Sequence, residues 1–309
     1  MRVAILDLGT NTFNLLVSEA SDKNRLSVIH TSKEPVKLGK GGIHKGLITE
    51  DAMERGFLAI EKLVERSREY SPEKIYAFAT SAIRDASNGK KFTNEVQKRF
   101  NIYIIIIPGE REAEMIYKGV RQSVQLGEKP VLILDIGGGS NEFIIGNKSG
   151  IFWKHSFNLG MARMLELFPP SDPITEKEIR ELERYFEMEL ENLYPAVNEF
   201  KPLTLIGASG SFETFAALLH YSNPEKYNIS LNEPSRIIDL EDYFALHNQL
   251  LKTTIEQRAE MQGMEPVRVE MIILATVFVN FVLRKFGVKT LVQSDYALKE
   301  GVIAEMLNL

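Results

Sequence analysis

The chain has 309 residues, of which 44% are apolar and 26% are charged, as expected for a globular protein with one or two domains. The formal net charge of −5 argues against a basic surface that binds nucleic acid, and the lack of cysteine excludes disulfides, thiolate metal sites and cysteine nucleophiles. The longest apolar stretch, residues 271–283, is shorter than the roughly 20 residues that cross a bilayer. Because the N-terminus also lacks a signal-peptide pattern, we predict a cytoplasmic protein without nucleic-acid or membrane partners.

Apolar periodicity predicts the same order of elements in both halves of the chain. The first half has three strands, a helix, a strand, a helix and a strand, at residues 3–6, 13–18, 26–31, 49–70, 75–79, 92–100 and 102–107. The second half repeats this order, at residues 131–134, 142–145, 151–157, 175–194, 203–206, a helix that begins near Ser211, and 291–293. Residues 223–262 form an additional polar segment, for which we predict mainly helix.

A duplicated βββαβαβ order is the plan of ribonuclease-H-like domains, and the chain resembles the superfamily of actin, hexokinase and the acetate kinases. We therefore predict an α/β protein with two ribonuclease-H-like domains and a ligand cleft between them. The predicted domains are residues 1–122 and residues 123–309. This interpretation leaves open that the last helix, residues 297–309, packs back on the first domain.

A short loop of the same pattern follows the first strand of each half. Residues 3–17 read VAILDLGTNTFNLLV and residues 131–145 read VLILDIGGGSNEFII. Glycine lets backbone N–H groups turn toward an anion, and small hydroxyl side chains add donors. We predict that the two turns hold a phosphate between them, through Gly9, Thr10, Asn11, Thr12, Gly137, Gly138, Gly139 and Ser140. The alternative is a pair of ordinary hairpins whose aspartates and glycines only make turns.

Three carboxylates beside these turns, Asp7, Asp135 and Glu142, are the predicted metal ligands. Mg²⁺ takes oxygen ligands and keeps several waters, so that one or two carboxylates and the substrate phosphates are enough to hold it. We therefore predict Mg²⁺ as the cofactor, with Mn²⁺ as the alternative metal.

Two segments in the first half add charged candidates. Arg84, within ATSAIRDASN at residues 79–88, is predicted to clamp a phosphate, or else only to pair with Asp85 or another acid. The helix that begins in IPGEREAEMIY, residues 107–117, opens with Glu110, Glu112 and Glu114. Acidic residues suit the first turn of a helix because of its dipole, but one of them could instead orient a water for attack on phosphorus.

A strand, a glycine-containing turn and a helix recur at residues 205–219, LIGASGSFETFAALL. Its turn adds further phosphate-binding candidates, namely Gly207, Ser209, Gly210 and Ser211. The alternative is a simple strand-to-helix turn capped by Ser211.

Together these segments resemble the exopolyphosphatase/guanosine pentaphosphate phosphohydrolase family, in a short, two-domain form. The matching segments follow the family's order and cover nearly the whole chain, at residues 7–16, 79–88, 108–120, 135–146, 158–168, 207–211 and 293–303. The resemblance implies an Mg²⁺-dependent hydrolase that releases the terminal phosphate of inorganic polyphosphate, or the 5′ phosphate of guanosine pentaphosphate. It also implies that Glu112 is the catalytic glutamate, that Asp135 and Glu142 handle metal and water, and that Arg84 contacts phosphate.

The chain departs from the family pattern at three positions. Asn14 and Lys299 stand where the family has arginine, and Asn141 stands where it has threonine. The first departure removes a cation from the phosphate site. The segment of residues 30–45, with four lysines and one glutamate, is the predicted replacement, in which Lys37 and its neighbours attract the polyphosphate tail. The alternative is a solvated, flexible loop.

The leading prediction is thus an exopolyphosphatase in which a water activated by Glu112 attacks the terminal phosphate. The alternatives are a guanosine pentaphosphate hydrolase, a small-molecule kinase, since the same fold and loops bind ATP phosphates, and a non-catalytic actin-like or polyphosphate-binding protein. We expect a homodimer, because members of the family commonly form dimers.

Overall fold

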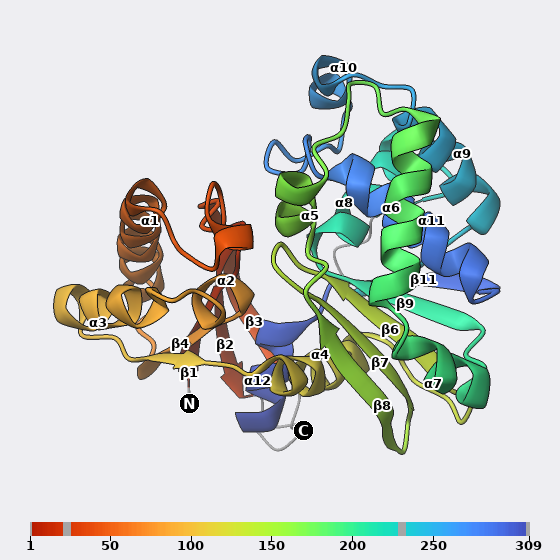
Figure 1. Ribbon diagram of the computed structural model, residues 1–309. Helices are drawn as coiled ribbons and strands as arrows, with labels where there is room; N and C mark the ends of the chain where they lie inside the picture. Colours follow the sequence, from red (N-terminus) through yellow and green to blue (C-terminus); the bar gives the residue numbers. More distant parts are fainter. Residues whose placement is uncertain (1, 21–25, 228–232, 307–309) are drawn as a thin grey trace.

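The molecule consists of two halves, each built on a mixed β-sheet with helices packed against it (Figure 1). The computed structural model describes residues 2–20, 26–227 and 233–306. Each half contains the predicted order of three antiparallel strands followed by parallel strands and helices, so that the predicted duplicated α/β fold is confirmed.

The first sheet has the strand order β3-β2-β1-β4-β5. Its strands are β1 (Arg2–Leu8), β2 (Thr12–Ala20), β3 (Leu26–Pro35), β4 (Lys74–Ala79) and β5 (Ile104–Ile106). The short 3₁₀ helix η1 (Ile43–Lys45) follows β3, and the helices of this half are α1 (Glu50–Arg68), α2 (Ser81–Arg84) and α3 (Gly89–Phe100). In α1, the predicted apolar face is buried, and the Thr49 side chain caps the helix by accepting from the Ala52 N–H at 3.3 Å.

The second sheet has the order β10-β11-β9-β6-β7-β8. Its strands are β6 (Val131–Ile136), β7 (Asn141–Asn147), β8 (Gly150–Phe157), β9 (Thr204–Ala208), β10 (Ser235–Ile238) and β11 (Thr290–Ser294). The sequence analysis missed β10, which lies in the segment predicted to be mainly helical and pairs antiparallel with β11 at the sheet edge. A strand of four residues, SRII, has too few alternations to stand out from its surroundings.

The helices of the second half are α5 (Met161–Leu167), α6 (Glu176–Glu189), α7 (Leu193–Phe200), α8 (Gly210–Ser222), α9 (Leu240–Leu250), α10 (Ile255–Glu260) and α11 (Ile272–Lys285). The single helix predicted at residues 175–194 was wrong, because α6 ends at Glu189 and α7 begins at Leu193. Pro195 explains the break, since its ring would clash with the carbonyl four residues earlier in a continuous helix. The capping box of Thr175 and Glu178 is confirmed.

Two helices cross between the halves. α4 (Gly109–Ser123) follows the first sheet in the chain but packs on β7 and β8, whereas α12 (Leu298–Met306) follows the second sheet but packs on β1, β2 and β3. The two helices also pack on each other (Figure 1). They contact closely at Gly119 and Gly301, where an added Cβ would lie 1.9 Å from the Ala297 carbonyl oxygen and 1.7 Å from that of Met115. One apolar cluster therefore joins both sheets, and the boundary at residues 122 and 123 stays a prediction.

The most apolar helix, α11, is buried from Ile272 to Leu283, as predicted for residues 271–283. Among the described residues, none of the helices combines the length and the apolar character needed to cross a bilayer.

Candidate active site

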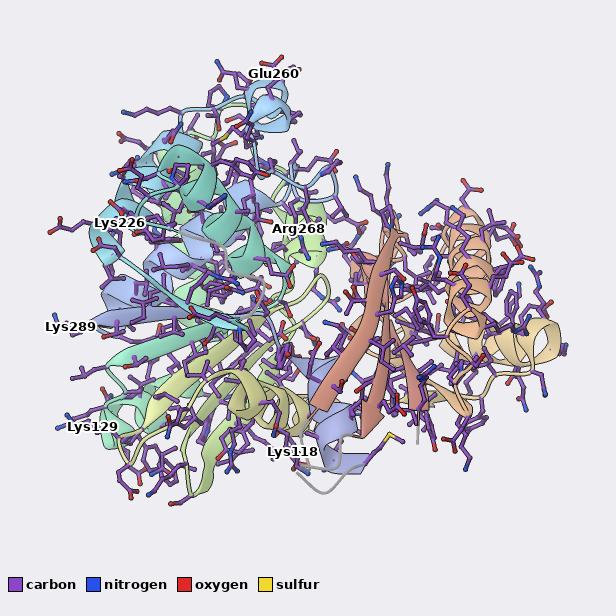
Figure 2. The ribbon with its side chains drawn as sticks, turned by 180° about the vertical axis from the view of Figure 1, so that it is seen from behind. Lys118, Lys129, Lys226, Glu260, Arg268 and Lys289 are labelled. Atoms are coloured by element: carbon purple, nitrogen blue, oxygen red, sulfur yellow. The ribbon has the colours of Figure 1, made fainter. Side chains whose placement is uncertain are left out.

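A polar cavity of about 130 Å³ lies where the two halves meet. Figure 2 shows the halves from behind, with Arg268 on the side of the second half that faces the first. The walls of the cavity include the β1–β2 turn, the β6–β7 turn, the start of α8, the segment before α11 and the start of α12. The cavity thus gathers segments from both ends of the chain.

The two predicted phosphate turns line this one cavity from opposite halves, and all eight of their candidate residues contribute to the lining. Only glycine fits where the turns approach each other. A Cβ on Gly138 would lie 2.5 Å from the Asn11 amide nitrogen, and one on Gly139 would lie 2.4 Å from the Ser81 hydroxyl. The turns are therefore placed to surround one small anion, and phosphate binding by them stays a prediction.

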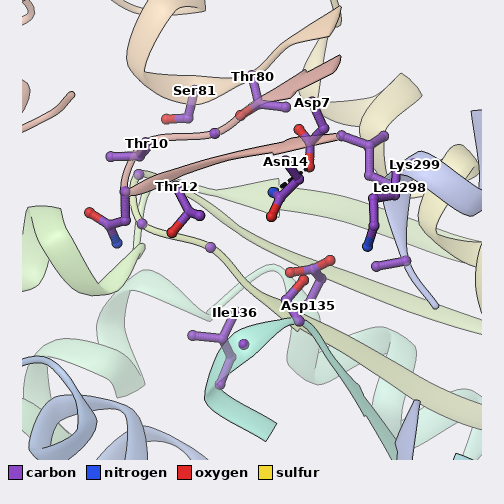
Figure 3. Close-up of a pocket in the computed structure, with 18 of the residues that line it drawn as sticks. Asp7, Thr10, Thr12, Asn14, Thr80, Ser81, Asp135, Ile136, Leu298 and Lys299 are labelled. Carbon is purple, nitrogen blue, oxygen red and sulfur yellow. Dashed lines mark hydrogen bonds between the residues drawn. The ribbon is translucent and has the colours of Figure 1, made fainter. Parts of the chain in front are cut away.

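Two aspartates lie on opposite walls of the cavity, at the strand positions that precede the turns. Asp7 accepts a hydrogen bond from the Asn14 side chain at 3.1 Å, and Asp135 lies across from it (Figure 3). Burial raises the pKa of Asp7 to about 6 and that of Asp135 to about 6, although the Lys299 ammonium opposes both shifts.

Glu112 lines the cavity from the first turn of α4 and is 7% exposed. Arg84 Nη1 donates to Glu112 Oε2 at 2.7 Å and to the Ile107 carbonyl at 3.1 Å. Burial, reinforced by the charge of Glu142, raises the pKa of Glu112 well above its usual range, whereas Arg84 lowers it. A buried carboxylate with a raised pKa is suited to accept a proton near neutral pH.

Glu142 and Arg84 lie behind Glu112 and outside the cavity lining. Glu142 accepts from the Ser156 hydroxyl at 2.6 Å, and its pKa is raised to about 7 by burial and by the charge of Asp135. Arg84 Nε also donates to Asp85 Oδ1 at 3.1 Å. The Arg84 guanidinium thus binds the carboxylates of Asp85 and Glu112. This agrees with the alternative interpretation, in which Arg84 pairs with Asp85 or another acid.

The described residues contain no group of three or more acidic, histidine or cysteine side chains placed to hold a metal ion. Asp7 and Asp135 nevertheless offer oxygen donors from two sides of one cavity, which fits a hard cation that keeps several waters. Most of the coordination of such an ion would come from water and from substrate oxygens.

The third predicted turn, at residues 207–211, contributes two of its four candidate residues to the cavity lining. Ser209 and Gly210 line the cavity, and Gly210 packs so closely on the Arg268 guanidinium that a Cβ would lie 2.0 Å from its Nη2. Gly207 instead packs under Phe212, and Ser211 is buried in the first turn of α8. Neither of these two residues is part of the lining.

Lys37 lies outside the cavity lining, and its Nζ is 2.9 Å from Glu270 Oε2 of the second half. Asn141, one of the departures from the family, is fully buried and donates to the Leu159 carbonyl at 2.9 Å.

Five charged residues of the lining had no role assigned from sequence, namely Glu213, Glu265, Arg268, Asp295 and Lys299, whereas Lys33 belongs to the lysine-containing segment predicted to attract the polyphosphate tail. Lys299, which stands where the family pattern has arginine, pairs with Glu300 at 3.0 Å. Lys33 lies directly opposite Asn14 in the register of β2 and β3. The charge of the segment indicated Lys33 in the sequence, but its position opposite Asn14 depends on the strand register, which a sequence alone does not contain.

Comparisons with known proteins agree with this architecture. The sequence pattern of the Ppx/GppA phosphatase family matches residues 16–309. The chain is 31% identical over 311 residues to a bifunctional 3-dehydroquinate synthase/phosphatase of Fusobacterium nucleatum, covering 98% of this chain but only 46% of that protein. It is 25% identical over 309 residues to exopolyphosphatase 1 of Mycobacterium leprae, covering 100% of this chain and 90% of that protein. The crystal structure of an exopolyphosphatase from Cytophaga hutchinsonii is similar with a TM-score of 0.96 and 38% identity, over 100% of this chain and 98% of that one.

Proposed function

Because the chain belongs to the Ppx/GppA phosphatase family, we propose that it is an exopolyphosphatase, which releases the terminal orthophosphate of inorganic polyphosphate. The family predicted from the sequence is confirmed, and the chain is accordingly an enzyme of a phosphatase family. The observation that supports the specific activity best is a buried glutamate, Glu112, at the edge of a cavity enclosed by two glycine-containing turns.

In the proposed reaction, the terminal phosphoryl group lies between the turns at residues 9–12 and 137–140. Glu112 orients a water and accepts its proton while the water oxygen bonds to phosphorus and the bridging P–O bond breaks. Orthophosphate and a chain shorter by one phosphate leave. Arg84 keeps the Glu112 carboxylate in place through its 2.7 Å hydrogen bond. The backbone N–H groups and hydroxyls of the turns are the donors for the equatorial phosphate oxygens, because phosphoryl transfer depends mainly on positioning and electrostatics.

Mg²⁺, or alternatively Mn²⁺, would be held by Asp7 and Asp135, with Glu142 behind them, and would neutralise charge on the phosphate oxygens. Lys37, which lies outside the lining and pairs with Glu270, would attract the part of the polyphosphate chain that extends beyond the cavity. The homodimer, the cytoplasmic location and the lack of nucleic-acid partners stay predictions.

The test is phosphate release from long-chain polyphosphate in the presence of Mg²⁺ or Mn²⁺. We expect release by the wild type, and a loss of about 100-fold or more in kcat for Glu112→Gln, which keeps the shape of the side chain but cannot accept the proton. Glu110→Gln is the matched control, since Glu110 begins the same helix but is exposed and pairs with His155. If the wild type releases no phosphate with either metal, the proposal is wrong. If Glu112→Gln and Glu110→Gln behave alike, only the role of Glu112 is wrong.

Guanosine pentaphosphate is the second candidate substrate. A cavity of about 130 Å³ would hold the terminal phosphate of either substrate, with the rest of the molecule outside it. Measuring kcat/KM for both substrates decides the order, and a higher value for the nucleotide would reverse it. Adding ATP with a sugar or acetate in the same panel tests the kinase alternative, and binding of polyphosphate without turnover would indicate a non-catalytic protein.

A further inference from the structure

One cation of the cavity lining is bound to carboxylates of the opposite half. Lys33 lies on β3 and pairs in register with Asn14 on β2. Directly opposite residues of an antiparallel pair point to the same face of the sheet. The Asn14 side chain reaches Asp7 on that face (Figure 3), so Lys33 extends from the first half toward the same cavity, which it also lines.

The partners of Lys33 are glutamates of the second half. Its ammonium forms an ion pair with Glu265, from the segment between α10 and α11, and lies 3.9 Å from Glu213 Oε2, in the first turn of α8. Both glutamates also line the cavity. The side chain of Lys33 is 48% exposed and that of Glu265 is 30% exposed, so water and ions reach the pair. Exposed pairs of this kind are weak, and a polyanion can displace the carboxylate.

The described lining contains two other cations, Lys299 and Arg268. Lys299 is held at 3.0 Å by Glu300, which is 2% exposed, and lies close to Asp7. Arg268 packs on the backbone of Gly210, and its buried Nε–H has no hydrogen-bond partner among the described residues. The charged group of Lys33 is accessible to solvent, and Lys33 lies directly opposite Asn14, where the family pattern has an arginine.

We propose that Lys33 binds the phosphate unit that follows the one being hydrolysed, and that Glu265 occupies Lys33 until a polyphosphate chain displaces it. The proposal rests on the proposed function and extends it to a second phosphate position within the same cavity. On this basis Glu265 competes with the substrate, so that it weakens binding although it contributes to the cavity wall.

Opposite effects of two substitutions distinguish this exchange from a simple clamp between the halves. Lys33→Ala should raise KM for long-chain polyphosphate about tenfold, the usual value of one charge-assisted contact, with kcat within about twofold. Glu265→Gln should lower KM about threefold, because it frees the lysine. In the double variant the benefit of Glu265→Gln should disappear, since the two residues act on each other. A clamp would instead make both single variants change KM in the same direction.

Lys62→Ala is the matched control. Lys62 forms a similar exposed ion pair at 3.4 Å with Glu34, the residue that follows Lys33 in the chain. Neither Lys62 nor Glu34 lines the cavity. Replacement of Lys62 should leave KM unchanged. Lys33→Arg keeps a cation and should stay within about threefold of the wild type, whereas Lys33→Gln should behave like Lys33→Ala.

A binding measurement separates this inference from the proposed function. Calorimetric titration of long-chain polyphosphate into Glu112→Gln protein, with Lys33→Ala or Glu265→Gln added, reports the same opposite shifts in Kd without turnover. Opposite shifts support the exchange even if the wild type releases no phosphate. Shifts in one direction, or none, overturn it even if the wild type is an active exopolyphosphatase. If no polyphosphate binds to any variant and none is hydrolysed, both the function and the inference are wrong.

Discussion

At the scale of single residues, the buried acids of the site make stability depend on pH. Glu142 has a pKa raised to about 7, and Asp7 and Asp135 have pKa values of about 6, so the folded protein holds more protons than the unfolded chain between about pH 4 and pH 7. The contribution of these acids to the free energy of unfolding is present at low pH and is lost as the pH rises through their pKa values in the folded protein. In metal-free buffer, the free energy of unfolding should therefore fall between pH 5 and pH 8.

Glu142→Gln removes one such acid and should raise stability at pH 8 by about 2 kcal/mol, with a smaller change at pH 5. Denaturant unfolding at both pH values measures this, and exposed Glu128→Gln is the control. A wild type that becomes more stable toward pH 8 without metal would contradict the pKa shifts.

At the scale of elements, the crossing of α4 and α12 determines how the halves meet. Gly119 and Gly301 allow the two helix backbones to contact each other, and any side chain there meets backbone atoms that cannot rotate away. Gly119→Ala and Gly301→Ala should each lower the free energy of unfolding by about 3 kcal/mol, at the upper end of overpacking effects. Gly127→Ala is the control, because a Cβ there has no atom within 4 Å and the change should stay within about 0.5 kcal/mol. Chemical denaturation of the three variants decides the matter; equal stabilities would show that the helices can separate without cost.

At the scale of the whole molecule, ion pairs outside the cavity lining join the two halves. Lys37 pairs with Glu270, His44 contacts Glu166, and Arg163 Nη2 lies 3.3 Å from Asp85 Oδ2. If the lysines of the segment at residues 30–45 attract the polyphosphate tail, replacing Lys37, Lys40 and Lys45 by Ala should raise KM for long chains about threefold and reduce the dependence of KM on salt, with kcat unchanged. The same charge change on α3, in Lys90, Lys91 and Lys98, is the control and should have no effect. Kinetics across a range of ionic strength test this. If the dependence of KM on ionic strength is unchanged, the segment does not bind polyphosphate.

The local patterns of the chain were enough to predict much of the fold and part of the site. Alternation of apolar residues identified the strands of both halves, except β10, which was too short. The two turns and their aspartates were recognisable because glycine, hydroxyl and carboxylate groups at a strand end have few structural uses. The break between α6 and α7 was also present in the sequence, at Pro195, and was overlooked.

The sequence by itself determined the duplicated βββαβαβ pattern, the two turns and the family, because each depends on residues that are close together in the chain. Only the tertiary structure decided that α4 and α12 exchange sheets, that Arg84 and Glu142 surround Glu112, and that Lys33 meets Glu265. These contacts join residues far apart in the chain, and they depend on strand register and on how the two halves pack. A helix or strand pattern specifies which face of an element is apolar, but the partner of that face is selected by packing over the whole molecule.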